Sequence, residues 1–96
     1  MPNVLNTNPL YFDTAGATSE ITTSVNITSI VWDSSTTGTV ADVVLLHDAS
    51  GGNVVWQCTL AVAKDVVIWT PAKPLNVEAG LYLTTLSDGI LLVYIA

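Results

Sequence analysis

The feature that most constrains the fold is a series of short runs rich in Val, Ile, Thr and aromatic residues, separated by turn signals. From Glu20 onward the interruptions come about every 8 to 12 residues, a spacing typical of all-β sandwiches and barrels. We therefore expect an all-β fold, namely a small antiparallel β-sandwich or jelly-roll-like barrel of about seven to eight strands.

The alternation of apolar residues places the expected strands along the chain. The strands are expected at Ser24–Trp32, Thr39–His47, Val54–Val62, Val66–Thr70, Leu75–Val77, Leu81–Leu86 and Ile90–Ile95. Helix is the competing interpretation for Val40–His47 and Leu60–Val67. Both segments are dominated by β-branched residues and lack helix caps, so strand is favoured.

Two details of these strands can be predicted from the side-chain period of two residues. Val25 and Ile27 have the opposite parity from Ile30 and Trp32, which predicts a β-bulge near Ser29. The clearest alternation follows the next turn, and we expect one shared face for Val54, Trp56, Cys58, Leu60 and Val62.

Turn residues indicate how the strands connect. The segment Asp48–Gly52 carries two adjacent glycines and predicts a hairpin between the strands that flank it. Asp88-Gly89 predicts a second tight hairpin, between Leu81–Leu86 and Ile90–Ile95. Pro71 and Pro74 are expected to end the strand before them.

The N-terminal region has a different character. Pro2 and Pro9 lie among asparagines, which predicts an extended arm over residues 1–19, followed by a β-sandwich domain over residues 20–96. The arm contains the apolar cluster Leu10, Tyr11 and Phe12, which requires burial. Either the cluster caps the core of its own domain, or the arm reaches a neighbouring subunit.

The charge content excludes several classes of partner. Only 10% of the 96 residues are charged, against about 25% in ordinary soluble domains. The net charge is −6, and the basic residues are Lys64 and Lys73 alone. This excludes the basic footprint of a nucleic-acid-binding protein and a polybasic attachment to membranes. A charge-poor surface on a small domain instead indicates contact with other proteins.

The chain carries no expected targeting signal. Its N-terminus lacks the basic start and apolar core of a signal peptide, and its longest apolar run, Ile90–Ala96, is far shorter than the roughly 20 residues of a membrane span. Cys58 is the single cysteine, which rules out an intramolecular disulfide. We expect synthesis in a reducing cytosol.

The sequence predicts no catalytic residue, cofactor or metal. His47 is the one histidine, and no Cys-x-x-Cys, glycine-rich phosphate loop or nucleophile elbow is present. Asp48, Ser50 and Asn53 could offer oxygen ligands to calcium, but the same residue types favour turns through local hydrogen bonds. A turn is the preferred interpretation.

The three tryptophans are the remaining candidates for binding. Trp56 shares a face with apolar residues and is expected in the core, whereas Trp69 lies in a strand with two apolar faces and suits a core or an interface equally. Trp32 lies at a strand end beside a polar loop, which makes it the best candidate for stacking on a sugar.

Two stretches of sequence resemble a known class of protein. The first opens with Ile27-Thr28-Ser29-Ile30-Val31-Trp32 and leads through the Asp48–Gly52 turn to Trp56. The second runs from Pro74-Leu75-Asn76-Val77 through Ser87-Asp88-Gly89 to Ile95. Together they resemble small all-β virion proteins of tailed bacteriophages, particularly capsid decoration (cement) proteins. The similarity covers about Ile27 to Ile95 and excludes the arm.

The resemblance implies a protein that binds the outer capsid lattice as a homo-oligomer, often a trimer, and bridges adjacent major capsid subunits. It implies a location on the virion surface. The candidate interface residues are Leu10, Tyr11, Phe12, Trp32 and Trp69. A carbohydrate- or receptor-binding module of a fibre, a head–tail component and a small bacterial adaptor domain are alternatives with similar composition.

Overall fold

A computed structural model describes residues 3–5, 7–16 and 19–96, and within these ranges the chain forms strands and no α-helix. The strands are β1 (Leu10–Phe12), β2 (Val25–Asp33), β3 (Val43–His47), β4 (Val54–Thr59), β5 (Val66–Trp69), β6 (Leu75–Val77), β7 (Tyr82–Leu86) and β8 (Ile90–Ile95). No helix in the described ranges is long and apolar enough to cross a membrane. The expected all-β fold is confirmed.

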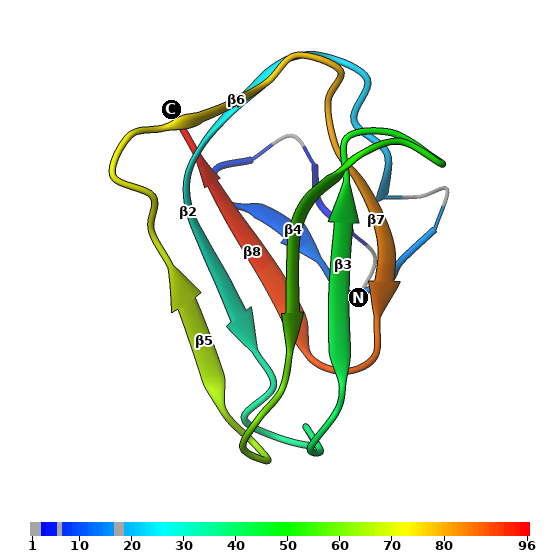
Figure 1. Cartoon of the computed structure of the whole chain (residues 1–96), viewed down its shortest axis with the longest axis vertical. Coiled ribbons are helices and arrows are strands. Elements are labelled where there is room, and N and C mark those ends of the chain that lie inside the picture. The colour runs from blue at the N-terminus through cyan, green and yellow to red at the C-terminus, as the bar shows by residue number, and fades with distance from the viewer. Residues whose placement is uncertain (1–2, 6, 17–18) are drawn as a thin grey trace.

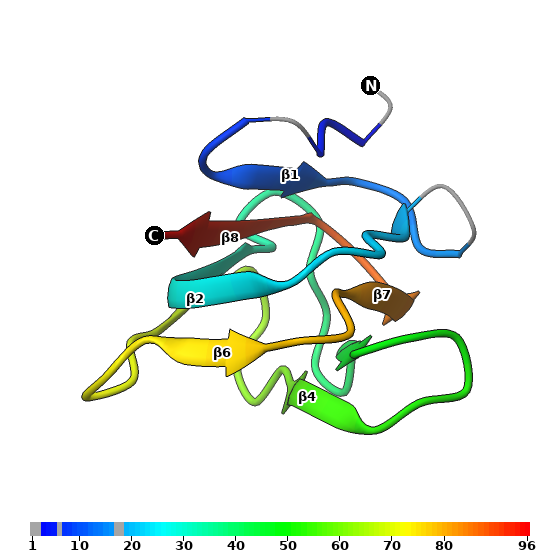
Figure 2. The ribbon, with the colours of Figure 1, turned by 90° about the horizontal axis from the view of Figure 1, so that it is seen from above.

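The strands form two antiparallel sheets that pack face to face (Figure 1). The larger sheet has five strands in the order β1-β8-β2-β5, and β6 also pairs with β2. The smaller sheet has three strands in the order β4-β3-β7. Figure 2 shows the β1, β8, β2 and β6 side of the molecule opposite β4 and β7. The arrangement is a small β-sandwich.

The expected bulge in β2 is confirmed, and it decides which residues enter the core. The pairing of β2 with β8 shifts register between Ile27 and Ser29. The extra residue reverses the side-chain parity, so Ile27, Ile30 and Trp32 all point inward, each with no exposed surface. A regular strand would have sent either Ile27 or the pair Ile30 and Trp32 into solvent.

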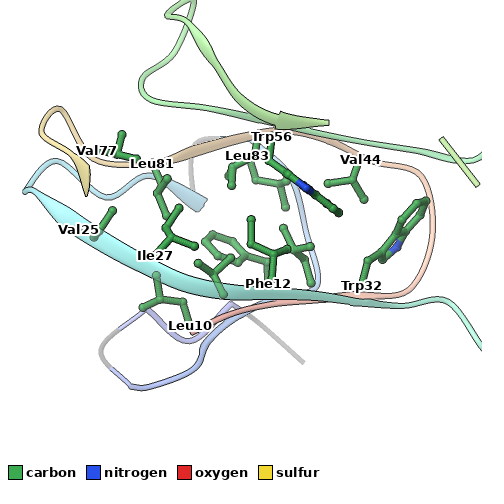
Figure 3. Close-up of a cluster of buried hydrophobic side chains, with 14 of the residues drawn as sticks. Leu10, Phe12, Val25, Ile27, Trp32, Val44, Trp56, Val77, Leu81 and Leu83 are labelled. Atoms are coloured by element: carbon green, nitrogen blue, oxygen red, sulfur yellow. The ribbon is translucent and has the colours of Figure 1, made fainter. Parts of the chain in front are cut away.

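The core lies between the sheets and receives side chains from both (Figure 3). The larger sheet contributes residues such as Phe12, Ile30 and Leu91, and the smaller sheet contributes Leu46 and Leu83, all fully buried. Burial of each such side chain stabilises the fold by about 1.5 to 3 kcal/mol. Trp56 is 9% exposed, so its expected place in the core is confirmed.

The predicted hairpin between β7 and β8 is wrong. β7 pairs with β3 in the smaller sheet, while β8 lies between β1 and β2 in the larger sheet. The Asp88-Gly89 turn therefore carries the chain from one sheet to the other. Both strands have a buried apolar face, including Leu83 on β7 and Leu91 on β8, and the crossing lets these two faces meet across the core.

Two strands are shorter than expected by three or more residues, and β5 and β7 are each shorter by one. β3 begins at Val43 rather than Thr39, because a turn precedes it in which Ala41 has a positive φ of 76°. β4 ends at Thr59 rather than Val62. The face predicted for β4 is correct at Trp56 and Leu60 but wrong at both ends, because Val54 and Val62 are 52% and 61% exposed.

The N-terminal segment packs along the sandwich. Leu10–Phe12 forms β1, which pairs with β8 in the register Leu10 with Val93 and Phe12 with Leu91. Val4 bridges to Tyr11 on the other side of β1, and Ile21 bridges to Leu81 beside β7. The predictions for residues 1, 2, 6, 17 and 18, including Pro2, fall outside the described residues.

Candidate interaction surface

The apolar cluster of the N-terminal segment divides between the two faces of β1. Leu10 and Phe12 point inward and are 2% and 0% exposed. They complete the core of their own chain, so their side chains are not available to a partner in this structure. Tyr11 has the opposite parity and is half-buried on the outer face of the sheet. Of the three residues, Tyr11 alone presents its side chain outward.

Trp32 does not occupy the exposed position expected of a sugar-stacking residue. Its side chain is fully buried, and its indole Nε1–H donates to the backbone oxygen of Asp88 at 2.8 Å. The bulge in β2 is the physical reason, because it rotates Trp32 toward the core. A stacking platform needs an open ring face, which Trp32 lacks.

Trp69 joins the two sheets at one side of the sandwich. It is half-buried on the inner face of β5, and its ring centroid lies 6.4 Å from that of Trp56 at an interplanar angle of 43°. This spacing is within the range of favourable aromatic pairs. Trp69 therefore acts partly as core and leaves only part of its surface for an interface.

The structure brings together a different set of residues as a candidate surface. Cross-strand pairing aligns Tyr11 with Leu92, Leu92 with Val31, and Val31 with Ile68. These four side chains form one apolar row across the outer face of β1, β8, β2 and β5. Solvated faces of antiparallel sheets are usually polar, so an apolar row here indicates a contact surface.

The rows on either side extend the same surface. One row pairs Ile90 and Val66 with the central Asp33, and the other contains Tyr94 opposite Ser29. Ile68, Val66 and Tyr94 are the most exposed members, at 68%, 43% and 37%. We call this surface the outer face; it consists of Tyr11, Val31, Val66, Ile68, Ile90, Leu92 and Tyr94, with Ser29 and Asp33 between them.

Asp33 is the one charged residue of the outer face, and it is held by its own loop. Its Oδ1 accepts hydrogen bonds from the Ser35 hydroxyl at 2.6 Å and the Ser35 backbone N–H at 3.0 Å. These bonds, the hydroxyl first, hold the pKa of Asp33 below its ordinary value of 3.8. Asp33 is therefore a charged boundary of the outer face at neutral pH.

A shallow pocket of about 230 Å³ lies at the end of β2, beside the outer face. Its lining consists of Asp33, Ser34, Thr36, Thr37, Asp88, Gly89 and Ile90. Both carboxylate oxygens of Asp88 accept from the Thr37 hydroxyl, at 2.7 and 2.9 Å. The polar groups of the pocket thus serve to tie two loops together.

The residues considered for chemistry take part in local structural contacts. His47 Nδ1 and the Thr84 hydroxyl share a hydrogen bond of 2.6 Å, and burial, with a further contribution from Asp65, raises the pKa of the Cys58 thiol. Asp48 Oδ1 accepts from the backbone N–H of Asn53 at 2.9 Å, as a turn requires. Within the described ranges no cluster of His, Cys, Asp and Glu could hold a metal ion.

The sequence contained a signal for the outer face that the sequence analysis used only at Trp69. Val66–Trp69 and Ile90–Leu92 are apolar at consecutive positions, so both faces of these strands carry apolar side chains. Such runs are typical of strands buried on both sides. Here the sandwich buries one side, and the other side faces outward.

No family model matches the chain, and neither a curated protein nor a solved structure matches it.

Proposed function

We propose that the protein is a structural subunit of a larger protein assembly and that it binds neighbouring subunits through the outer face. One observation carries the proposal: the apolar row Tyr11–Leu92–Val31–Ile68 crosses four strands on the outer face, where Ile68 is exposed and the other three side chains are partly exposed. Charge-poor, aromatic-containing surfaces are typical of interface cores. The low charge content of the whole chain supports the same conclusion.

We further propose that the assembly is a bacteriophage capsid, whose major capsid subunits the protein cements from outside as a homo-oligomer. The support for this step is the resemblance of the Ile27–Trp32 and Pro74–Ile95 stretches to capsid decoration proteins. Lattice binding fits a broad, flat surface, since many identical contacts on a symmetric shell add avidity to modest individual affinities.

The alternative is a carbohydrate-binding or head–tail module of a phage fibre or tail. A glycan site on this chain would need an exposed aromatic platform, and the burial of Trp32 removes the first candidate for one. Trp69 packs its ring against Trp56, so it is a weak second candidate for a sugar-stacking residue. Neither Trp32 nor Trp69 therefore supports a sugar site.

The test is the abundance of the chain in purified particles, measured by quantitative mass spectrometry against the major shell protein. A ratio near one copy per shell subunit, or per threefold position of the lattice, is the expected result. A few copies per particle would favour the tail or fibre. Absence of the chain from particles would overturn the capsid proposal.

A pair of variants tests whether the outer face makes the contact. Tyr94→Glu adds a negative charge to the outer face, whereas Gln57→Glu adds the same charge to an exposed position of β4 on the other sheet. We expect Tyr94→Glu to reduce binding to particles and Gln57→Glu to leave it unchanged. The reverse order would place the contact on the smaller sheet.

A further inference from the structure

The sandwich has two flanks, one formed by the edge strands β1 and β7 and the other by β5 and β4. The edge strands of the two flanks differ in whether another segment pairs with them. On one flank, the N-terminal segment covers the edge of β1, where Val4 and Tyr11 exchange two backbone hydrogen bonds of 2.8 Å. Figure 2 shows the chain before β1 running alongside this strand. The edge strand of the larger sheet is therefore paired on this side.

The same segment also covers the edge of β7. Gly16 N–H donates to Leu83 O at 2.9 Å, Leu83 N–H donates to the buried Ser19 hydroxyl at 3.1 Å, and Ile21 bridges to Leu81. Covering an edge prevents another chain from pairing with it. One flank of the sandwich is thus sealed on both sheets.

The opposite flank ends in β5 and β4, and no described segment pairs with the outer edge of β5 (Figure 1). β5 consists of Val66, Val67, Ile68 and Trp69, without a charged side chain. Ile68 is 68% exposed. An open, uncharged and apolar edge strand is a template for pairing with another strand.

The backbone of β5 shows which groups remain for a partner. The Val66 N–H donates a hydrogen bond to Asp65 Oδ1 at 2.9 Å, so this donor is already bonded within the chain. Backbone groups alternate in direction along a strand, so Ile68 presents its N–H and C=O on the same edge as Val66. Ile68 therefore lies at the centre of the open edge.

We propose that β5 pairs antiparallel with β5 of a second copy, about a two-fold axis at Ile68. This register sets Ile68 opposite its own image, Val67 opposite Trp69 and Val66 opposite Thr70. A two-fold contact requires a surface that complements itself, and an uncharged strand of this length does so. The pairing joins the outer faces of two copies into one continuous apolar surface.

The charges flanking β5 fit this pairing. Asp65 falls opposite Pro71, and the two copies of Asp65 are separated by six residue steps, which is roughly 20 Å at about 3.4 Å per step. That distance exceeds the screening length of about 8 Å at physiological salt. Chains that each carry a net charge of −6 can therefore meet at β5 without placing like charges opposite one another.

The inference goes beyond the proposed function and stands on the open edge alone. It gives a two-fold dimer, whereas the resemblance to decoration proteins implies a trimer. Its test uses the purified chain without particles. A failure of self-pairing would leave capsid binding open, and absence from particles would leave the dimer open.

The test is sedimentation equilibrium of the full chain, together with Ile68→Lys and the control Val40→Lys. Val40 is 62% exposed and lies in the turn before β3, so the control adds the same charge at similar exposure away from β5. Two lysines facing each other across the axis should weaken association by at least about tenfold. The expected result is a dimer for the wild type and Val40→Lys and a monomer for Ile68→Lys.

A second measurement separates backbone pairing from other modes of association. Amide hydrogen exchange at Ile68 should slow as the protein concentration rises through the dimerisation range, while exchange in the β3–β4 turn stays constant. A wild type that remains monomeric at high micromolar concentration, a trimer, or a dimer that survives in folded Ile68→Lys would each overturn the inference. A monomer whose Ile68 amide becomes protected on binding particles would assign the edge to a strand of the shell protein instead.

Discussion

The ring of Trp56 on β4 lies 6.4 Å from the ring of Trp69 on β5, and this contact joins the two sheets at the flank that the N-terminal segment does not cover. The sealed flank is held by backbone hydrogen bonds. At the open flank this aromatic pair bridges the two sheets. The two flanks are therefore stabilised by different forces.

The aromatic pair gives the first prediction. Trp56→Ala should destabilise the fold by about 3 to 5 kcal/mol, as expected for truncating a core aromatic, and Trp69→Ala should cost less because Trp69 is half-buried. A double-mutant cycle followed by urea denaturation should give a coupling of about 0.5 to 1.5 kcal/mol. A coupling indistinguishable from zero would show that the rings are neighbours without a stabilising contact.

The seal on the other flank depends on Ser19, a fully buried residue. Its hydroxyl accepts from Leu83 N–H at 3.1 Å and donates to Gly16 O at 2.6 Å. Ser19→Ala should cost about 1 to 3 kcal/mol, because it leaves the buried Leu83 N–H without its acceptor. The exposed control Ser50→Ala should stay within about 0.5 kcal/mol of the wild type in the same denaturation assay. Equal effects would mean that the N-terminal segment does not hold β7.

The turn between the sheets provides a test of close packing. Gly89 has a φ of +80°, and a Cβ there would lie 2.3 Å from Asp33 O, whereas Gly51 has a φ of +73° with open space around it. Gly51→Ala should cost about 1 to 2 kcal/mol for the left-handed backbone alone. Gly89→Ala should cost clearly more, measured as a lower midpoint of thermal unfolding. If the two variants lose the same stability, the close approach of Gly89 to the Asp33 backbone oxygen does not constrain the turn.

Asp33 gives a prediction for pH. Because hydrogen bonds from Ser35 lower its pKa in the folded protein, Asp33 favours the folded state above its ordinary pKa of 3.8, and this contribution disappears as the pH falls through the lower folded value. Ser35→Ala removes the hydroxyl donor and should move the pKa of Asp33 upward. An NMR titration of the Asp33 carboxyl carbon measures the shift, and an unchanged pKa would contradict the assigned cause.

The local features of the fold were predictable because they depend on neighbouring residues. The parity change between Ile27 and Ile30 predicted the β2 bulge, and the glycines after Asp48 predicted the β3–β4 hairpin. The Asp88-Gly89 turn was misassigned because a tight turn reverses the chain both within one sheet and between two sheets. Which sheet receives the next strand depends on where Leu83 and Leu91 find apolar partners, and that is a property of the whole core.

The candidate surface was predictable only in part. Tyr11 and Trp69 were named from the sequence, but Leu10, Phe12 and Trp32 proved to be buried, because register and the bulge fix which parity faces inward. The apolar row through Leu92 and Val31 depends on which strands become neighbours. Since β8 lies between β1 and β2, residues from opposite ends of the chain meet on one face.

Hydroxyl-radical footprinting shows most directly whether the outer face is the contact surface. The labelling of the three tyrosines is compared between the isolated chain and the assembled particle. Tyr11 and Tyr94 lie on the outer face, and Tyr82 lies on β7 in the other sheet, where it serves as an internal control. We expect assembly to protect Tyr11 and Tyr94 from labelling and to leave Tyr82 reactive. Protection of Tyr82 alone, with Tyr11 and Tyr94 unchanged, would contradict it.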